Sequence, residues 1–196
     1  EGETMTDELS FWSMARNHPL DIAVIEDDDS ELSFGLLHAR SNRLVHGLRK
    51  LGLRRGDGIA LVLENEGAVY ELFMAATQAG LYVTPINPKL APPEILYVLK
   101  NSEAKAVFVT PALTEPVQRA LSDGPVPAEA RFATGALPGF RDYAAFRDAE
   151  SDREPDDRSA GTMMTYTSGT TGQPKGVRRP LPEGTPEEMG ERYTTM

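Results

Sequence analysis

The chain has 196 residues, no cysteine and a formal net charge of −10 at pH 7. An acidic chain lacks the basic face on which nucleic acids and anionic membrane surfaces bind, which disfavours both as partners. The absence of thiols excludes disulfides, thiolate metal ligands and a cysteine nucleophile. The sequence has neither a run of about 18 apolar residues nor a basic stretch leading into an apolar one, so we expect a cytoplasmic protein with no integral membrane segment.

Short apolar runs alternate with helical patterns over the first half of the chain. Continuous apolar strands joined by helices are typical of parallel β-α-β units whose sheet is covered on both faces. The sequence therefore predicts an α/β fold. The expected strands cover residues 22–25, 32–34, 59–63, 81–86 and 105–109, and the expected helices cover residues 33–51, 65–79 and 94–101.

The ends of the expected helices carry residues suited to capping. Ser33 and Asn65 stand where an N-cap oxygen is needed, and Gly52 follows the first helix at a position that favours a left-handed residue. Pro92 precedes the third helix, where proline is tolerated because its missing N–H would have had no partner. Near the end of the chain, residues 185–188 read Thr-Pro-Glu-Glu, a capping box that predicts the start of another helix.

The region from Thr110 to Arg158 is interrupted by prolines, and only residues 143–149 have a helical pattern. Its acidic part, residues 148–157, predicts a solvated connection. A metal site formed by Asp and Glu is the alternative there, as is a calcium site in the acidic turn at residues 26–30. Neither stretch has the ligand spacing of a known loop, so we predict no metal ligand from this chain.

A run of glycines and hydroxyl residues with a single lysine occupies residues 165–177. Glycines allow positive φ angles and close approach of the backbone, and inward N–H groups, hydroxyls and an ammonium together suit a polyphosphate. A flexible linker is the alternative. The run differs from the Walker A loop of P-loop hydrolases, because Lys175 lies three residues after Gly172 and is followed by Gly176.

Residues 166–177, Tyr-Thr-Ser-Gly-Thr-Thr-Gly-Gln-Pro-Lys-Gly-Val, resemble the signature loop of the acyl-adenylate-forming, or AMP-binding, enzymes. Residues 32–37 and 78–88 resemble two further segments of that family, so the likeness extends from about Phe11 to Val177. The resemblance implies an α/β fold that forms part of the large N-terminal domain of such an enzyme, here truncated. It implies an N-terminal α/β subdomain at residues 1–160, and the phosphate-loop segment with the start of a missing subdomain at residues 161–196.

The resemblance also implies a reaction. In the family the loop closes over the β- and γ-phosphates of ATP, with Mg²⁺, while a carboxylate attacks the α-phosphorus. Pyrophosphate leaves, and the acyl group of the resulting acyl-AMP passes to CoA. By resemblance Lys175 has the catalytic role. The ATP-binding residues are Thr167, Ser168, Gly169, Thr170, Thr171, Gly172 and Lys175.

Within the family, the sequence is most similar to the N-terminal part of a fatty-acid or other acyl-CoA synthetase. Several alternatives stay open: an adenylation domain for another acid, and a non-catalytic nucleotide-binding or interaction fragment. No histidine follows Lys175, although the family often has one there, so the acid is not defined. Arg178 and Arg179 are either phosphate contacts or solvent-facing charges, and we favour the second. We expect the 196-residue chain alone to be inactive, and open sheet edges predict that it self-associates.

Overall fold

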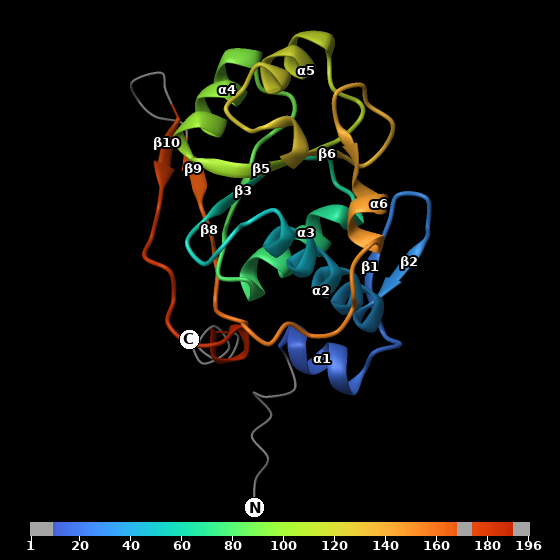
Figure 1. The fold of residues 1–196 in the computed structure, drawn as a ribbon. Coiled ribbons are helices and arrows are strands. Elements are labelled where there is room, and N and C mark those ends of the chain that lie inside the picture. Colours follow the sequence, from blue (N-terminus) through green and yellow to red (C-terminus); the bar gives the residue numbers. More distant parts are fainter. Residues whose placement is uncertain (1–9, 168–173, 190–196) are drawn as a thin grey trace, which may run out of the picture.

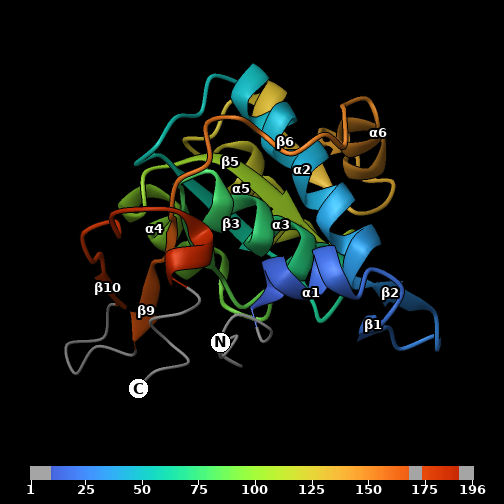
Figure 2. The same cartoon turned by 90° about the horizontal axis from the view of Figure 1, so that it is seen from below.

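A computed structural model of the chain describes residues 10–167 and 174–189. A sheet of six strands lies between two layers of helices (Figure 1). The short helix α1 (Phe11–Asn17) packs on α2 (Figure 2). One layer holds α2 (Phe34–Lys50), α3 (Gly67–Gln78) and α6 (Tyr143–Asp148), and the other holds α4 (Pro92–Asn101) and α5 (Glu115–Ser122).

All five strand pairings in this sheet are parallel, which confirms the predicted β-α-β organisation. The order is β7-β6-β5-β3-β4-β8. From the central pair β3 and β5, the sheet extends through β4 and β8 on one side and through β6 and β7 on the other. Ligands of such sheets bind outside the carboxyl ends of the strands, where the direction of winding changes. The strands are β3 (Gly58–Val62), β4 (Tyr82–Pro85), β5 (Ala104–Val109), β6 (Arg131–Ala133), β7 (Arg141–Asp142) and β8 (Thr162–Met163).

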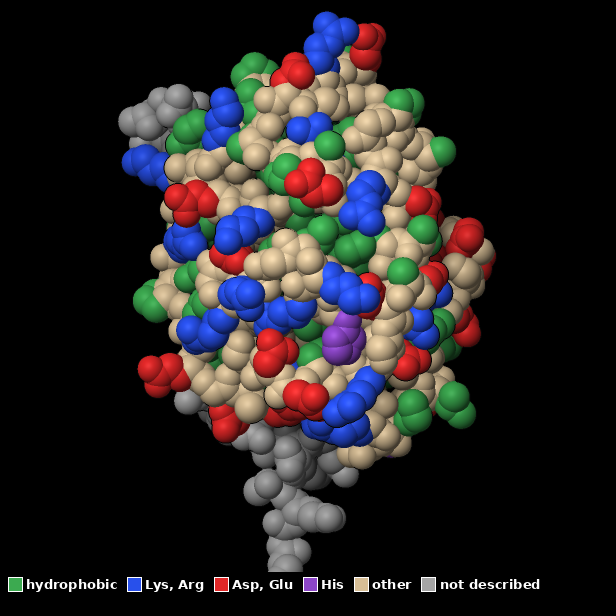
Figure 3. All heavy atoms as spheres, viewed as in Figure 1, with side chains coloured by type: hydrophobic (Ala, Val, Ile, Leu, Met, Phe, Trp, Pro, Cys, Tyr) green, Lys and Arg blue, Asp and Glu red, His purple; other side chains and the backbone are tan. Residues whose placement is uncertain are grey.

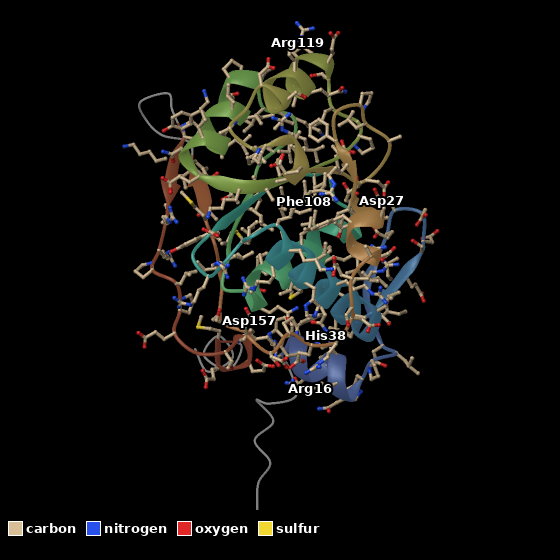
Figure 4. All side chains as sticks on the ribbon, viewed as in Figure 1. Arg16, Asp27, His38, Phe108, Arg119 and Asp157 are labelled. Carbon is tan, nitrogen blue, oxygen red and sulfur yellow. The ribbon has the colours of Figure 1, made fainter. Side chains whose placement is uncertain are left out.

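The centre of the sheet is apolar on both faces, as the continuous runs predict. Every residue of β3 is buried. On β5, Phe108 is fully buried between the two helical layers (Figure 4), and its ring stacks on that of Phe132 with 5.1 Å between centroids. Burial of this apolar surface is the main term that stabilises the fold.

Two of the expected caps are confirmed at α2. The Ser33 hydroxyl accepts a hydrogen bond from the Leu36 amide at 3.3 Å, and Gly52 follows the helix with φ of 88°. The predicted cap at Asn65 is wrong. Helix α3 has Glu66 as its N-cap, and the carboxylate of Glu26, on the hairpin of β1 (Ile22–Ile25) and β2 (Glu31–Ser33), accepts from the Gly67 amide at 2.8 and 3.0 Å.

The capping box near the end of the chain is confirmed. The Thr185 amide donates to the Glu188 carboxylate at 2.9 Å, and the Glu188 amide donates to the Thr185 hydroxyl at 3.4 Å. Residues 186–189 are helical. The reciprocal pair satisfies two amides that a helix start leaves without partners.

The region after Thr110 contains elements that the sequence pattern does not predict. Helix α5, the 3₁₀ turn Ala128–Ala130 and strands β6 and β7 all lie there. The two strands have three and two residues, too few for a period to be recognised. They form because β5 offers a free edge, with Phe108 aligned with Phe132 in the register.

The acidic stretch at residues 148–157 is not simply a solvated connection. Glu150, Asp152 and Asp157 form ion pairs with Lys50, Arg43 and Arg49 of α2, at 2.8, 3.2 and 2.9 Å. Figure 3 shows basic and acidic side chains intermingled over this face. Within residues 10–167 and 174–189, no group of three or more metal-ligating side chains is placed to hold a metal ion, and no helix is long and apolar enough to cross a membrane.

Candidate phosphate-binding hairpin

The motif singled out in the sequence forms the arms of a β-hairpin. After β8, the chain continues into β9 (Thr165–Thr167) and returns as β10 (Lys175–Val177), antiparallel to β9. The hairpin lies outside the six-stranded sheet, beside the end of α4 (Figure 1). Since β8 runs parallel to β4, the chain enters the hairpin from the carboxyl end of the sheet's edge strand.

Two of the predicted site residues are brought together by the hairpin register. Thr167 and Lys175 are directly opposite each other, and both are exposed. The Lys175 ammonium has no ion-pair partner in the described part of the chain, so its charge is available to an external anion. The other predicted residues, Ser168, Gly169, Thr170, Thr171 and Gly172, lie outside the described residues.

Gly176 is needed in the hairpin because a side chain there would have no room, not because its φ angle is unusual. It lies opposite Tyr166, and a Cβ atom there would stand 2.8 Å from the Tyr166 ring and 2.9 Å from the methyl carbon of Met164. Only a residue without a side chain lets the ring cross β10. The sequence predicts close approach at this glycine, but to a ligand, whereas the described contact is with a tyrosine of the same motif.

The hairpin is held on the body of the protein by side chains. The Tyr166 hydroxyl donates to the Asn101 side-chain oxygen at the end of α4, 2.7 Å away. Beyond β10, the Arg178 guanidinium donates to the Glu103 carboxylate at 2.9 Å and lies 4.6 Å from the centre of the Tyr82 ring. Arg178 is thus engaged by the protein.

The surroundings of the two donors raise their pKa values. Burial raises the pKa of Tyr166 to about 12, so its hydroxyl stays a donor at neutral pH. The hydrogen bond to Glu103 raises the pKa of Arg178, which favours the charged form. Sequence reasoning missed Asn101 and Glu103 because neither belongs to the motif. Asn101 ends α4 and Glu103 lies in the turn before β5, and nothing in the local pattern indicates that the hairpin packs there.

Two cavities open at the carboxyl ends of the central strands. One, of about 600 Å³, is lined by residues that follow β3 and β4, including Asn65, Ile86 and Lys89. The other, of about 480 Å³, is lined by carboxylates, among them Glu26 and Glu66, and by Arg40 and Arg147, which pair with Glu71. Its carboxylates outnumber its two guanidinium groups, which disfavours a nucleotide's polyphosphate there.

The acidic cavity is fixed by a buried cluster. Glu71 is 2% exposed and accepts hydrogen bonds from Arg40 at 2.9 Å, Arg147 at 2.9 Å and the Tyr143 hydroxyl at 2.6 Å. These partners neutralise the carboxylate and join α2, α3 and α6. Burial, together with neighbouring carboxylates, raises the pKa of Glu66 at the same edge. The cluster serves packing between helices, which residue types alone did not reveal.

An α/β fold with parallel β-α-β units, followed by the glycine- and hydroxyl-rich motif, is what the resemblance to acyl-adenylate-forming enzymes implies. The chain belongs to the AMP-binding enzyme family, whose family model matches residues 11–180. The match includes both arms of the hairpin and all six strands of the sheet. The family resemblance and the α/β fold are therefore confirmed.

Similar proteins are ligases. The chain is 30% identical over 179 residues to the fatty acid–[acyl-carrier-protein] ligase ScoC of Streptomyces coeruleorubidus, covering 89% of this chain and 32% of ScoC. It is 36% identical over 175 residues to feruloyl-CoA synthase of an Amycolatopsis species, covering 86% of this chain and 32% of the synthase.

A solved structure shows the same fold. The inhibitor-bound N-terminal domain of FACL13 from Mycobacterium tuberculosis matches with a TM-score of 0.67 and 31% identity, over 85% of this chain and 43% of that one. The chain spans about a third of the length of the curated relatives named above. It therefore matches one portion of an acid-activating ligase.

Proposed function

We propose that this chain is the N-terminal part of an ATP-dependent ligase that activates a carboxylic acid as acyl-AMP and transfers it to CoA. The observation that carries the proposal is the hairpin register. It places the exposed Lys175 opposite Thr167, at the base of the segment whose sequence resembles the family's phosphate loop. Residues 168–172 are proposed as further phosphate ligands, on sequence alone.

The chemistry explains why such a site needs these groups. Attack of a carboxylate on the α-phosphorus brings two anions together, so catalysis depends on positioning and on neutralising charge. The Lys175 ammonium would stabilise charge on the leaving pyrophosphate, and hydroxyl and amide donors would fix its oxygens. Mg²⁺ bound together with the nucleotide would neutralise phosphate charge, and we assign it no ligand from this chain.

The named relatives differ in the acid and in the thiol. One is a fatty acid ligase for acyl carrier protein, and another is a feruloyl-CoA synthase. Because another curated relative is a long-chain fatty acid–CoA ligase of Mycobacterium tuberculosis, 33% identical over 152 residues, we propose a fatty acid and CoA as the substrates to test first. Acyl carrier protein is the second acceptor to test.

We also propose how the 196 residues divide and behave. Residues 1–160 are proposed as an α/β subdomain and residues 161–196 as the phosphate-loop segment with the start of the next subdomain. On this view the fragment is cytoplasmic, inactive alone and prone to self-association. A sharp thermal transition of a monomer that does not depend on protein concentration would contradict the last point.

ATP–pyrophosphate exchange by the complete gene product tests the function. We expect exchange that depends on an added acid, in a panel of fatty and aromatic acids, and exchange that is about 10²–10³-fold slower in Lys175→Ala. Lys100→Ala is the matched control, because Lys100 is an exposed lysine on neighbouring α4. If no acid in the panel supports exchange, the proposed ligase function is wrong and a non-catalytic nucleotide-binding fragment is favoured. Steady phosphate release without acid would instead indicate a hydrolase.

A further inference from the structure

The end of α4 and the turn that follows it hold the hairpin. Asn101, the last residue of α4, accepts the hydrogen bond of Tyr166 on β9. Glu103, in the turn between α4 and β5, accepts that of Arg178 just after β10. Glu103 has φ of 54°, in the left-handed region that non-glycine residues seldom occupy. Two side-chain acceptors only two residues apart therefore hold the hairpin.

We infer that Asn101 and Glu103 form an anchor that positions Lys175, with Tyr166 as the connecting residue. The inference rests on the proposed function, because the anchor matters for activity only if Lys175 binds ATP. None of the three would touch the nucleotide. They act through the hairpin, because Tyr166 precedes Thr167, the partner of Lys175, and faces Gly176, which follows Lys175.

The two contacts of the anchor differ in strength. Arg178 and Glu103 are 42% and 74% exposed, and ion pairs of this kind contribute little in water. The hydrogen bond between Tyr166 and Asn101 is also exposed, but it is 2.7 Å long and the Tyr166 ring is partly buried against the core. We therefore assign the larger share of the anchoring to Tyr166 and Asn101.

The position of the hairpin depends on such contacts because its strands do not join the central sheet. Strands β9 and β10 pair only with each other within the described residues. Backbone hydrogen bonds fix the register of Lys175 against Thr167, and the Met164 amide, just before β9, donates to the Val83 carbonyl of β4 at 2.9 Å. Side-chain contacts then hold β9 and β10 against the body, and a lysine misplaced by about 1 Å can cost on the order of a hundredfold in rate.

Kinetics of the complete gene product test the inference. We expect Tyr166→Phe to raise KM for ATP and lower kcat of ATP–pyrophosphate exchange, with a combined loss of about fivefold, the size of one hydrogen bond. Asn101→Leu should give the same loss, and Asn101→Asp, which keeps an acceptor, should restore near-normal values. Tyr70→Phe is the matched control, because Tyr70 is a 49% exposed tyrosine on α3 and its hydroxyl makes no hydrogen bond to any described residue.

A double-mutant cycle separates positioning from general stability. If Tyr166 acts through Lys175, Tyr166→Phe should cause little further loss in a Lys175→Ala background. Equal losses in both backgrounds would overturn the positioning role.

Hydrogen exchange of the 196-residue chain tests the anchor without any activity. We expect the amides of β9 and β10 to exchange about fivefold faster in Tyr166→Phe, and those of β3 to be unchanged. Unchanged exchange in β9 and β10 would overturn the anchor itself. If the complete product shows no acid-dependent exchange of pyrophosphate, the proposed function fails, and hydrogen exchange still decides whether the anchor exists.

Discussion

The central sheet and the hairpin are held in place by different forces. Strand β3 is buried along its whole length, and its position follows from apolar side chains packed on both faces. The arms of the hairpin are mostly exposed, and a few polar contacts from Tyr166 and Arg178 attach them to the body. Stability is thus concentrated in the sheet, and the proposed chemistry lies where packing is sparse, as is usual for functional loops.

The largest expected effect on the sheet side comes from Phe108→Ala. Removing a fully buried ring leaves a cavity, and we expect a loss of about 3–5 kcal/mol in the free energy of unfolding. Urea denaturation followed by circular dichroism measures it. Leu20→Ala is the control, since Leu20 is 88% exposed and its truncation should be nearly silent. Similar losses in both variants would contradict the buried core described here.

Lys175→Ala should have the largest effect on the hairpin side. We expect adenylation by the complete gene product to slow by about 10²–10³-fold, the usual cost of removing one charge-stabilising donor. Thioester formation from pre-made acyl-AMP should be less affected, because that step releases no pyrophosphate. Unfolding of the chain should be unchanged, as Lys175 is exposed. Equal loss in both half-reactions would count against the assigned role.

Gly176→Ala should affect both the local packing of the hairpin and the activity. The new methyl group would collide with the Tyr166 ring, and overpacking of this kind costs about 1–3 kcal/mol. We expect adenylation to fall by about tenfold while the urea midpoint of the sheet moves little. The matched control is Gly58→Ala on β3, where the nearest atom would be 3.5 Å from the added carbon. A larger activity loss for Gly58→Ala would show that the ring contact is unimportant.

The smallest effect should come from the ion pairs between α2 and the acidic stretch. Asp152→Asn removes the charge of Asp152, which pairs with Arg43 and whose side chain is 58% exposed. We therefore expect a loss of about 0.2–1 kcal/mol in the free energy of unfolding. The loss should shrink in 1 M salt, where the Debye length is about 3 Å. Urea titrations at low and high salt measure it. If the loss of stability is the same in high salt, it comes from packing of the acidic stretch on α2 and not from charge.

The two regions also differ in how well the sequence predicts them. The buried strands and the α2 caps follow from local patterns, because burial on both faces demands continuous apolar residues and helix ends need oxygen acceptors. Strands β6 and β7 have too few residues to show a pattern and depend on the free edge of β5. The N–H of Gly67 at the start of α3 is satisfied by Glu26, which is distant in sequence, so the local pattern wrongly predicts Asn65 as the cap.

For this protein, the sequence by itself determined the α/β class, the parallel strands and the family to which the loop motif belongs. Those features depend on short stretches whose periodicity and spacing are local. Only the tertiary structure decided that Tyr166 reaches Asn101, that Gly176 makes room for a ring, and that acidic residues pair with α2. Such contacts join residues far apart in the chain, and no local pattern encodes which of them will meet once the apolar core has formed.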